Sequence, residues 1–304
     1  MFTARETPKM LMRSVAAVLK AAPPGLTIDI LANGNPKLGN ALSNAICQHP
    51  VLPDGVVLRL WHIPHGDKAN AWNQYLHQIW RGQTLTFFVD GYVRPLPDAL
   101  RLLGNAVMGS DHAHGGSGVP TVGHSAAVLR ASMLKNGGIH GNLCCMKGSF
   151  ISRIKQRGIR LPVGLYRTDS MMGTMLACDL GAAPRGWDIA RLLVHSEATW
   201  DMDDLVWWRA SSTYIYWSRR MRQARGDLEI QAFKDFFAKR EGAPELLPAT
   251  AHEMVMDWVQ RCPERAQTTL RRHPLRLWAM RRLARELPPA RQDLLPALVW
   301  SSGG

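Results

Sequence analysis

A short apolar segment, Thr84–Val89, runs directly into the acidic residue Asp90, and a turn and a new helical pattern follow. Apolar, β-branched and aromatic residues dominate this segment, which is typical of a strand buried on both faces of a parallel sheet. Such a strand needs helices on both faces, so it constrains the chain to an α/β fold. Ligands of open α/β sheets bind at the carboxyl ends of the strands. Asp90 is therefore expected to face a ligand crevice.

The segments before this strand alternate between helical and strand patterns. Thr7-Pro8 predicts the start of a helix that ends at about residue 22, and Asp67 predicts the start of another. Strand patterns at Leu26–Leu31 and Val56–Trp61 separate the helices. The alternation up to about residue 109 predicts a parallel sheet covered by helices, with room for only a very short first strand at residues 2–4.

The second half of the chain has a different pattern. Glycine-rich residues 110–120 predict a flexible loop, and residues from about 203 onward are mostly helical. We therefore expect an α/β domain at residues 1–202 and a mainly helical region at residues 203–304. The stretch Arg265–Arg291 holds eight arginines and one acid. It could lie on an anionic membrane surface or pack as an ordinary terminal helix.

The 304-residue chain carries a formal net charge of +13, spread along its length. This excess suits an anionic ligand, an anionic membrane surface or nucleic acid, and charge alone does not choose among them. The absence of helix-turn-helix, zinc-finger and RNP patterns disfavours nucleic acid. Five cysteines without a C-x-x-C pair indicate reduced thiols in a cytoplasmic protein. No apolar run reaches the roughly 18 residues typical of a membrane-spanning helix.

Four segments, in this order and spacing, resemble family 2 glycosyltransferases of the GT-A fold. Residues 67–73, D-K-A-N-A-W-N, are similar to the family's helix start G-K-A-x-A-L-N. Residues 89–95 resemble its strand that ends in D-x-D with a nearby proline. Residues 138–143 and 161–169 are similar to the segment that delivers its catalytic carboxylate. The resemblance covers roughly residues 2–230 and implies an α/β three-layer sandwich with a mainly parallel central sheet and a helical C-terminal extension.

The chain departs from the family pattern at three places. Asn33-Gly34 stands in the turn that the family writes D-D-G-S, and Tyr92 replaces the second acid of D-x-D. Residues 219–226 look like a degenerate Q-x-x-R-W element in which Gly226 replaces the tryptophan.

The resemblance implies an inverting glycosyltransferase. Its donor would be a nucleotide-sugar, preferably UDP-linked, and its acceptor a hydroxyl of a glycan or lipid. Asp169 would be the general base that takes the proton of the acceptor hydroxyl. Asp90 would contact the ribose and hold Mg²⁺ or Mn²⁺, which would neutralise the leaving diphosphate. Such an enzyme would act in polysaccharide or glycolipid synthesis in the cytoplasm, with peripheral contact to the inner face of the membrane.

The resemblance also assigns donor binding to several polar side chains. The asparagines that follow a strand would bond the base or ribose, and a lysine at a helix start would meet phosphate with the help of the helix dipole. Arginine forks suit the oxygens of a diphosphate. These residues are Asn33, Asn35, Lys68, Asn73, Asp90, Arg222 and Arg225.

Each assignment has a plainer structural alternative. Asp90 and Asp169 could cap the turn or helix that follows them, and Asn-Gly turns occur without a ligand. The arginines could form a solvated helix face. Because Tyr92 replaces an acid, the chain could also be a catalytically inactive GT-A-like binding or scaffold protein. The basic charge leaves a nucleic-acid-binding protein as a further alternative.

Overall fold

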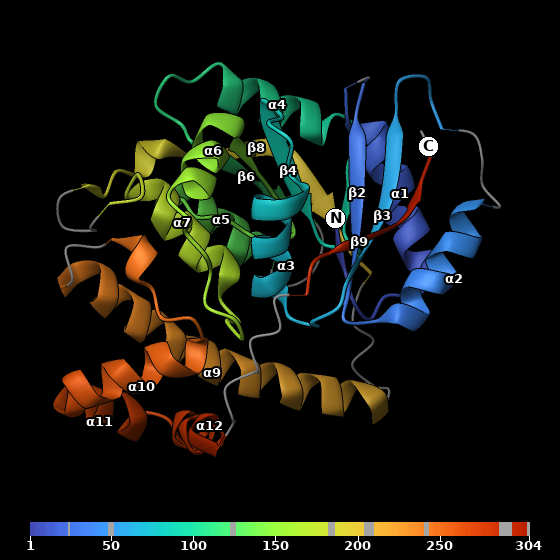
Figure 1. The fold of residues 1–304 in the computed structure, drawn as a ribbon. Coiled ribbons are helices and arrows are strands. Elements are labelled where there is room, and N and C mark those ends of the chain that lie inside the picture. Colours follow the sequence, from blue (N-terminus) through green and yellow to red (C-terminus); the bar gives the residue numbers. More distant parts are fainter. Residues whose placement is uncertain are drawn as a thin grey trace.

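The computed structural model describes residues 1–23, 25–47, 52–121, 126–181, 186–203, 210–239, 243–285 and 294–302. An α/β body holds two β-sheets, and a layer of helices lies along one side of it (Figure 1). The helices of the body are α1 (Pro8–Ala21), α2 (Pro36–Cys47), α3 (Lys68–Gln74), α4 (Ala99–Met108), α5 (Ala126–Asn136), α6 (Gly148–Gln156) and α7 (Thr168–Ala177). The layer consists of α9 (Ala210–Lys239), α10 (Ala251–Arg261), α11 (Pro263–Arg271) and α12 (Pro274–Arg285).

The first sheet has four strands in the order β1-β2-β3-β9. They are β1 (Phe2–Thr3), β2 (Thr27–Asn33), β3 (Val57–Ile63) and β9 (Ala297–Ser301). The first three run parallel, and β9 runs antiparallel to β3. The short first strand that the sequence predicts is confirmed as β1, which lies between β2 and the end of β4 and makes a parallel bridge from Phe2 to Asp90.

The second sheet has five strands in the order β4-β7-β6-β8-β5. They are β4 (Leu85–Val89), β5 (Arg94–Pro95), β6 (Gly115–Pro120), β7 (Leu143–Lys147) and β8 (Leu192–Asp201). Among the described strands of this sheet, the β6–β8 pair alone is parallel, whereas β4–β7, β6–β7 and β5–β8 are antiparallel.

The expectation of a mainly parallel central sheet is therefore wrong, although the α/β class holds. The helix–strand alternation that predicts parallel strands breaks down after α4, because β7 enters between β4 and β6 in the opposite direction. A strand covered on both faces is apolar throughout in either direction, so the pattern of residues 84–89 carries no information about the direction of its partner.

The expectation of a loop at residues 110–120 is wrong for its second half, because Gly115–Pro120 forms the buried strand β6. Its glycines allow neighbouring backbone to approach closely. A Cβ atom at Gly115 would lie 2.5 Å from the carbonyl oxygen of Cys145, and one at Gly118 would lie 2.3 Å from that of Ala198. Glycine here marks tight strand packing rather than a flexible loop.

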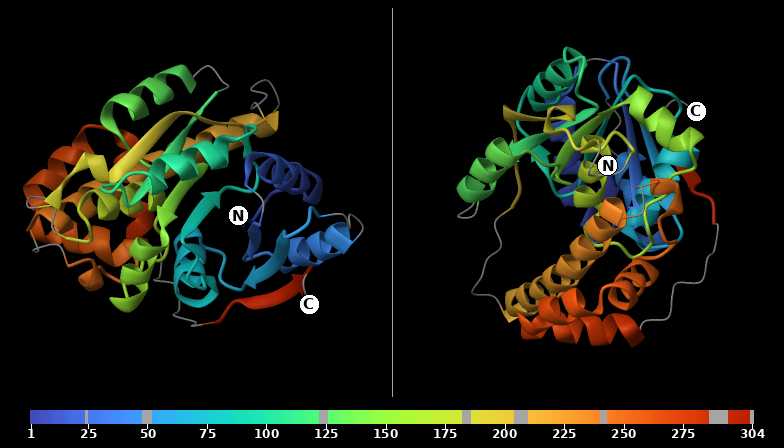
Figure 2. Two further views of the ribbon diagram at one scale, coloured as in Figure 1. Left: turned by 90° about the horizontal axis from the view of Figure 1, so that it is seen from above. Right: turned by 90° about the vertical axis from the view of Figure 1, so that its left-hand side faces the viewer.

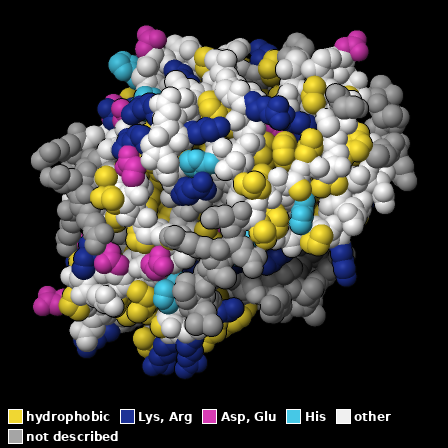
Figure 3. Space-filling view, viewed as in Figure 1, with side chains coloured by type: hydrophobic (Ala, Val, Ile, Leu, Met, Phe, Trp, Pro, Cys, Tyr) yellow, Lys and Arg dark blue, Asp and Glu magenta, His cyan; other side chains and the backbone are white. Residues whose placement is uncertain are grey.

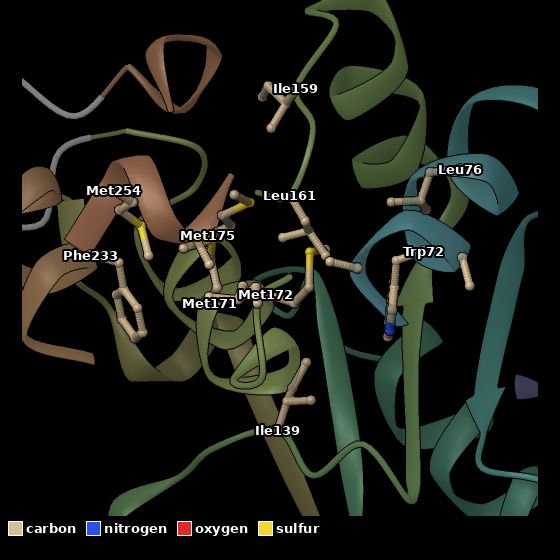
Figure 4. Close-up of a cluster of buried hydrophobic side chains, with 14 of the residues drawn as sticks. Trp72, Leu76, Ile139, Ile159, Leu161, Met171, Met172, Met175, Phe233 and Met254 are labelled. Atoms are coloured by element: carbon tan, nitrogen blue, oxygen red, sulfur yellow. The ribbon is translucent and has the colours of Figure 1, made fainter. Parts of the chain in front are cut away.

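Two apolar clusters cover the two faces of the sheets. One lies under α1, α2 and α4, and the other lies under α3 and α7. The second cluster continues without a break into the helical layer: Met171 and Met175 of α7 lie between Trp72 of α3 and the side chains Phe233 of α9 and Met254 of α10 (Figure 4). This shared core fixes the start of α7, and with it Asp169, relative to α3.

The chain returns from the helical layer to the α/β body at its end. After α12, β9 lies along β3 at the edge of the first sheet, apart from the helices that precede it (Figure 2). The domain boundary at about residue 203 remains a prediction. No described helix is both long and apolar enough to cross a membrane.

Candidate functional site

Two loops at the carboxyl ends of β2 and β3 press against each other. Gly34 has a φ of +62°, and a Cβ atom on it would lie 2.2 Å from the Cα atom of Gly66. Only glycine permits this approach. The contact brings the end of β2, with Asn33, beside the loop that leads to Asp67 and Lys68 at the start of α3.

Asp90 lies directly after β4 and is buried, with 8% of its surface exposed. The Lys68 ammonium donates hydrogen bonds to both carboxylate oxygens, at 2.7 and 2.9 Å. The Tyr92 hydroxyl lies 3.2 Å from the second of these oxygens and 3.0 Å from the side-chain oxygen of the buried Asn142. The predicted strand-end acid is therefore the centre of a polar network.

Opposing influences act on the pKa of Lys68. Burial is the largest and lowers the pKa, but the charge of Asp90, its hydrogen bond and then the charge of Asp169 outweigh it and raise the pKa above its ordinary value. The side chain of Lys68 thus carries a positive charge across the physiological pH range.

Asp169 lies in the first turn of α7 and acts electrostatically on this ammonium. Its carboxylate accepts hydrogen bonds from the backbone N–H of Ser170 at 2.9 Å and of Gly141 at 3.4 Å. A Cβ atom on Gly141 would lie 3.1 Å from the Lys68 nitrogen and 3.8 Å from an Asp169 oxygen. Lys68 and Asp169 therefore both lie next to Gly141, where a side chain would crowd the Lys68 ammonium.

Asn73 does not present its amide to this cluster. Its nitrogen donates to the carbonyl of Leu161 and its oxygen accepts from the N–H of Leu161, both at 2.8 Å and both buried. Asn73 thus fastens α3 to the segment that leads to Asp169, which is a positioning role.

The two asparagines after β2 differ. Asn35 accepts from the N–H of Leu38 at 3.0 Å, as a cap of α2, and donates to the carbonyl of Ala4 at 2.9 Å. The side-chain oxygen of Asn33 is buried and accepts no hydrogen bond from any described residue. Because a buried oxygen without a donor is costly, Asn33 is the better candidate for a ligand contact.

The predicted arginines lie on α9. Arg225 donates to Glu229 at 3.1 Å and to the carbonyl of Gly164 at 3.1 Å, so it holds the segment before α7. Glu229 also accepts from the N–H groups of Tyr166 and Arg167. Arg222 is exposed on the same helix.

The residues around Asp90 do not match a divalent metal site. Mg²⁺ and Mn²⁺ bind through several oxygen ligands, usually carboxylates. Lys68 engages both Asp90 oxygens, and Tyr92 supplies a hydroxyl where a second acid would stand. Across the described ranges, no group of three or more histidine, cysteine or acidic side chains could hold an ion.

Two members of the network had no role in the sequence interpretation. Asn142 and Gly141 belong to the segment 138–143 that carries the resemblance, but only the folded chain places them against Tyr92 and Lys68. Tyr92 counted only as a missing acid, whereas it is a hydrogen-bond partner of Asp90.

Comparison with known proteins supports the fold. No family model and no curated protein matches the sequence. Among solved structures, the chain is similar to the mannosyltransferase PcManGT from Pyrobaculum calidifontis, solved in complex with GDP-Man and Mn²⁺, with a TM-score of 0.54 and 18% identity over 93% of this chain and 82% of that one. The chain thus has a fold similar to that of this mannosyltransferase, and the match does not single out family 2.

Proposed function

We propose that the protein is a glycosyltransferase that moves a sugar from a nucleotide-sugar to an acceptor hydroxyl with inversion. The observation that carries this proposal is the Lys68 cation bound to Asp90 at the end of β4, with Asp169 near enough to raise its pKa. Ligands bind at strand ends in α/β folds, and a partly buried cation there suits a diphosphate. The fold is that of a protein solved with a nucleotide-sugar.

Asp169 is the proposed general base. It would take the proton of the acceptor hydroxyl while that oxygen bonds to the anomeric carbon from the face opposite the leaving group. The bond between the anomeric carbon and the diphosphate oxygen would break, and its electron pair would leave with the nucleoside diphosphate. Lys68 would stabilise the charge that develops on the diphosphate, at a site already set up for it.

The end of β2 would bind the nucleoside. The unpartnered buried oxygen of Asn33 would accept a hydrogen bond from the base or the ribose. We retain the UDP-sugar as the first donor to test. The GDP-Man bound to PcManGT makes a GDP-sugar the second.

The acceptor would be a glycan or a lipid, and α12 supports contact with an anionic membrane. Leu277 and Trp278 are exposed on this helix, and Arg282 lies 5.6 Å above the Trp278 ring. Exposed apolar side chains next to arginines are typical of interfacial helices. On the face of the molecule that Figure 3 shows, the basic side chains lie in several separate groups. Flotation with anionic vesicles, but not with zwitterionic ones, is the expected result.

The test of the proposed function is release of nucleoside diphosphate. The purified protein is incubated with UDP- and GDP-sugars, in the presence and absence of Mn²⁺, and the nucleotide product is measured together with the melting temperature. Release that depends on protein, with a donor-induced rise in melting temperature, would support a transferase. Binding without release would favour an inactive GT-A-like binding protein, for which the loss of an acid at Tyr92 is the specific argument.

A further inference from the structure

The Asp90 carboxylate is shielded from a ligand by Lys68. The Asp90 side chain retains 12% exposure, whereas the Lys68 side chain retains 35%. The Lys68 side chain is thus the more accessible member of the pair, while its ammonium is bound to the carboxylate. Both carboxylate oxygens already accept hydrogen bonds from this ammonium.

The position of Lys68 is held by several independent contacts. Its ammonium lies 5.9 Å above the ring of Phe2, in addition to its bonds to Asp90. Phe2 is itself stacked on Trp72 and Phe88, with ring centroids 5.3 and 6.1 Å apart. These contacts fix the position of the Lys68 ammonium.

The segment around Asp90 is shaped for this arrangement. A Cβ atom on Gly91 would lie 3.0 Å from the carbonyl oxygen of Phe2, so the turn packs tightly on β1. The next residue, Tyr92, then directs its hydroxyl at Asp90 and at Asn142. A tyrosine at this position completes the hydrogen bonding of Asp90 without adding a negative charge.

The charges also balance. Two carboxylates with a divalent cation have the same net charge as one carboxylate with an ammonium. The replacement of the second acid by Tyr92 and the pairing of Asp90 with Lys68 therefore leave the local charge unchanged relative to a metal-loaded acid pair. A metal ion that bound at the positions of the two Lys68 hydrogen bonds would have to displace Lys68.

We propose that the Lys68 ammonium takes the place of the divalent cation in this site and binds the donor diphosphate directly, so that donor binding needs no metal. This inference rests on the proposed function and specifies how that site recognises its donor. Charge-assisted hydrogen bonds from the ammonium would reach the diphosphate oxygens, while Asp90, Tyr92 and Asn142 position Lys68 from behind.

The test compares donor binding in EDTA and in Mn²⁺ by titration calorimetry with UDP- and GDP-sugars. We expect the same Kd in both conditions. Lys68→Met keeps the apolar stem on Phe2 but removes the charge. It should weaken binding by about ten- to a hundredfold, the range for loss of a hydrogen bond to a charged group. Lys135→Ala removes a lysine exposed on α5 and serves as the control with unchanged Kd.

Each other outcome is decisive. Binding that requires Mn²⁺ would overturn the role of Lys68 and leave the proposed transferase in place. Wild-type affinity in Lys68→Met, measured in EDTA on folded protein, would also overturn it. No binding of any nucleotide-sugar in either condition would overturn the proposed function and this inference together. The comparison of EDTA with Mn²⁺ uses the wild-type protein and is independent of variant folding.

Discussion

Two regions of the molecule bury carboxylates beside cations, with different consequences. In the helical layer, the side chain of Asp235 on α9 is fully buried and accepts hydrogen bonds from Arg261 at 3.1 Å and Arg265 at 3.0 Å. In the candidate site, the partner of Asp90 is a lysine that stays about one-third exposed. Both pairs are close and well formed, so pairing alone does not identify a site.

The difference lies in what each pair joins and what it leaves open. Asp235 ties α9 to the end of α10 and to α11, and it is enclosed by the side chains it binds. Lys68 and Asp90 join the start of α3 to the end of β4, and the loop before α3 contacts the loop that follows Asn33, whose side-chain oxygen has no described partner. A buried ion pair is weak evidence of function. A partly exposed cation near a buried polar atom that lacks a hydrogen-bond partner is stronger evidence of a ligand site.

The sharpest test of this contrast is Asp169→Asn. Loss of a general base should lower the rate of sugar transfer by about a hundred- to ten-thousandfold, whereas donor binding and the melting temperature should change little. Initial rates and donor Kd are measured side by side. Asp111→Asn, at an exposed position, is the control with an unchanged rate. A transfer rate close to wild type in Asp169→Asn would show that another group is the base.

Asp235→Ala should show the opposite behaviour. Removal of this carboxylate leaves the charges of Arg261 and Arg265 without their buried partner and should lower the free energy of unfolding by about 3–5 kcal/mol. The donor Kd of the folded protein should not change. Asp257→Ala removes a half-buried partner of the same Arg261 and should cost only about 0–1 kcal/mol in chemical denaturation. Equal losses in the two variants would contradict the structural role of Asp235.

Gly34→Ala tests the contact between the two site loops. The added methyl group would collide with the backbone of Gly66, and we expect a loss of about 2–3 kcal/mol of stability together with weaker donor binding. Gly82→Ala is the matched control: its φ is also positive, +91°, but a Cβ atom there would meet nothing within 4 Å. The loss of stability in Gly82→Ala measures the backbone strain alone. The additional loss in Gly34→Ala measures the cost of the collision with Gly66.

Glu229→Gln should give the smallest effect, seen as a dependence on pH. Burial is the main influence on Glu229 and raises its pKa above 4.5, against the opposing influence of Arg225. The folded state then holds its proton to higher pH than the unfolded state. Wild-type stability is therefore favoured below about pH 4.5 and falls, relative to Glu229→Gln, as the pH rises through the folded pKa.

The slope of this change cannot exceed about 1.4 kcal/mol per pH unit for one proton. Denaturation midpoints of both proteins between pH 4 and 8 would measure it. A constant difference between them over this range would show that Glu229 titrates alike in the folded and unfolded states.

Local sequence signals identified most of the elements of the α/β body. The predicted helix from Thr7-Pro8 is α1, and the three predicted strands correspond to β2, β3 and β4 within two residues at each end. Capping residues and apolar runs are short-range signals, so one sequence is sufficient to read them. The same signals placed Asp90 at a strand end and Asp169 at a helix start.

Capping residues and apolar runs do not predict which strands pair with each other. The glycines of β6 look like a loop until the backbones of β7 and β8 lie against them, and β9 has no partner until β3 is formed. The direction of β7 depends on where the chain turns, which a buried apolar run does not encode. The pairing of strands distant in sequence is set by the packing of the whole molecule.

The site divides in the same way. The residue types and their places at element ends follow from sequence, because a strand or helix boundary is a local property. The contacts between these side chains exist only after folding, because they join segments at least 22 residues apart in the sequence. They are the bond from Lys68 to Asp90, the contact of Tyr92 with Asn142, and the approach of Lys68 and Asp169 to Gly141. The sequence therefore determines which side chains are available to the site, and the tertiary packing sets Lys68, rather than a second acid, against Asp90.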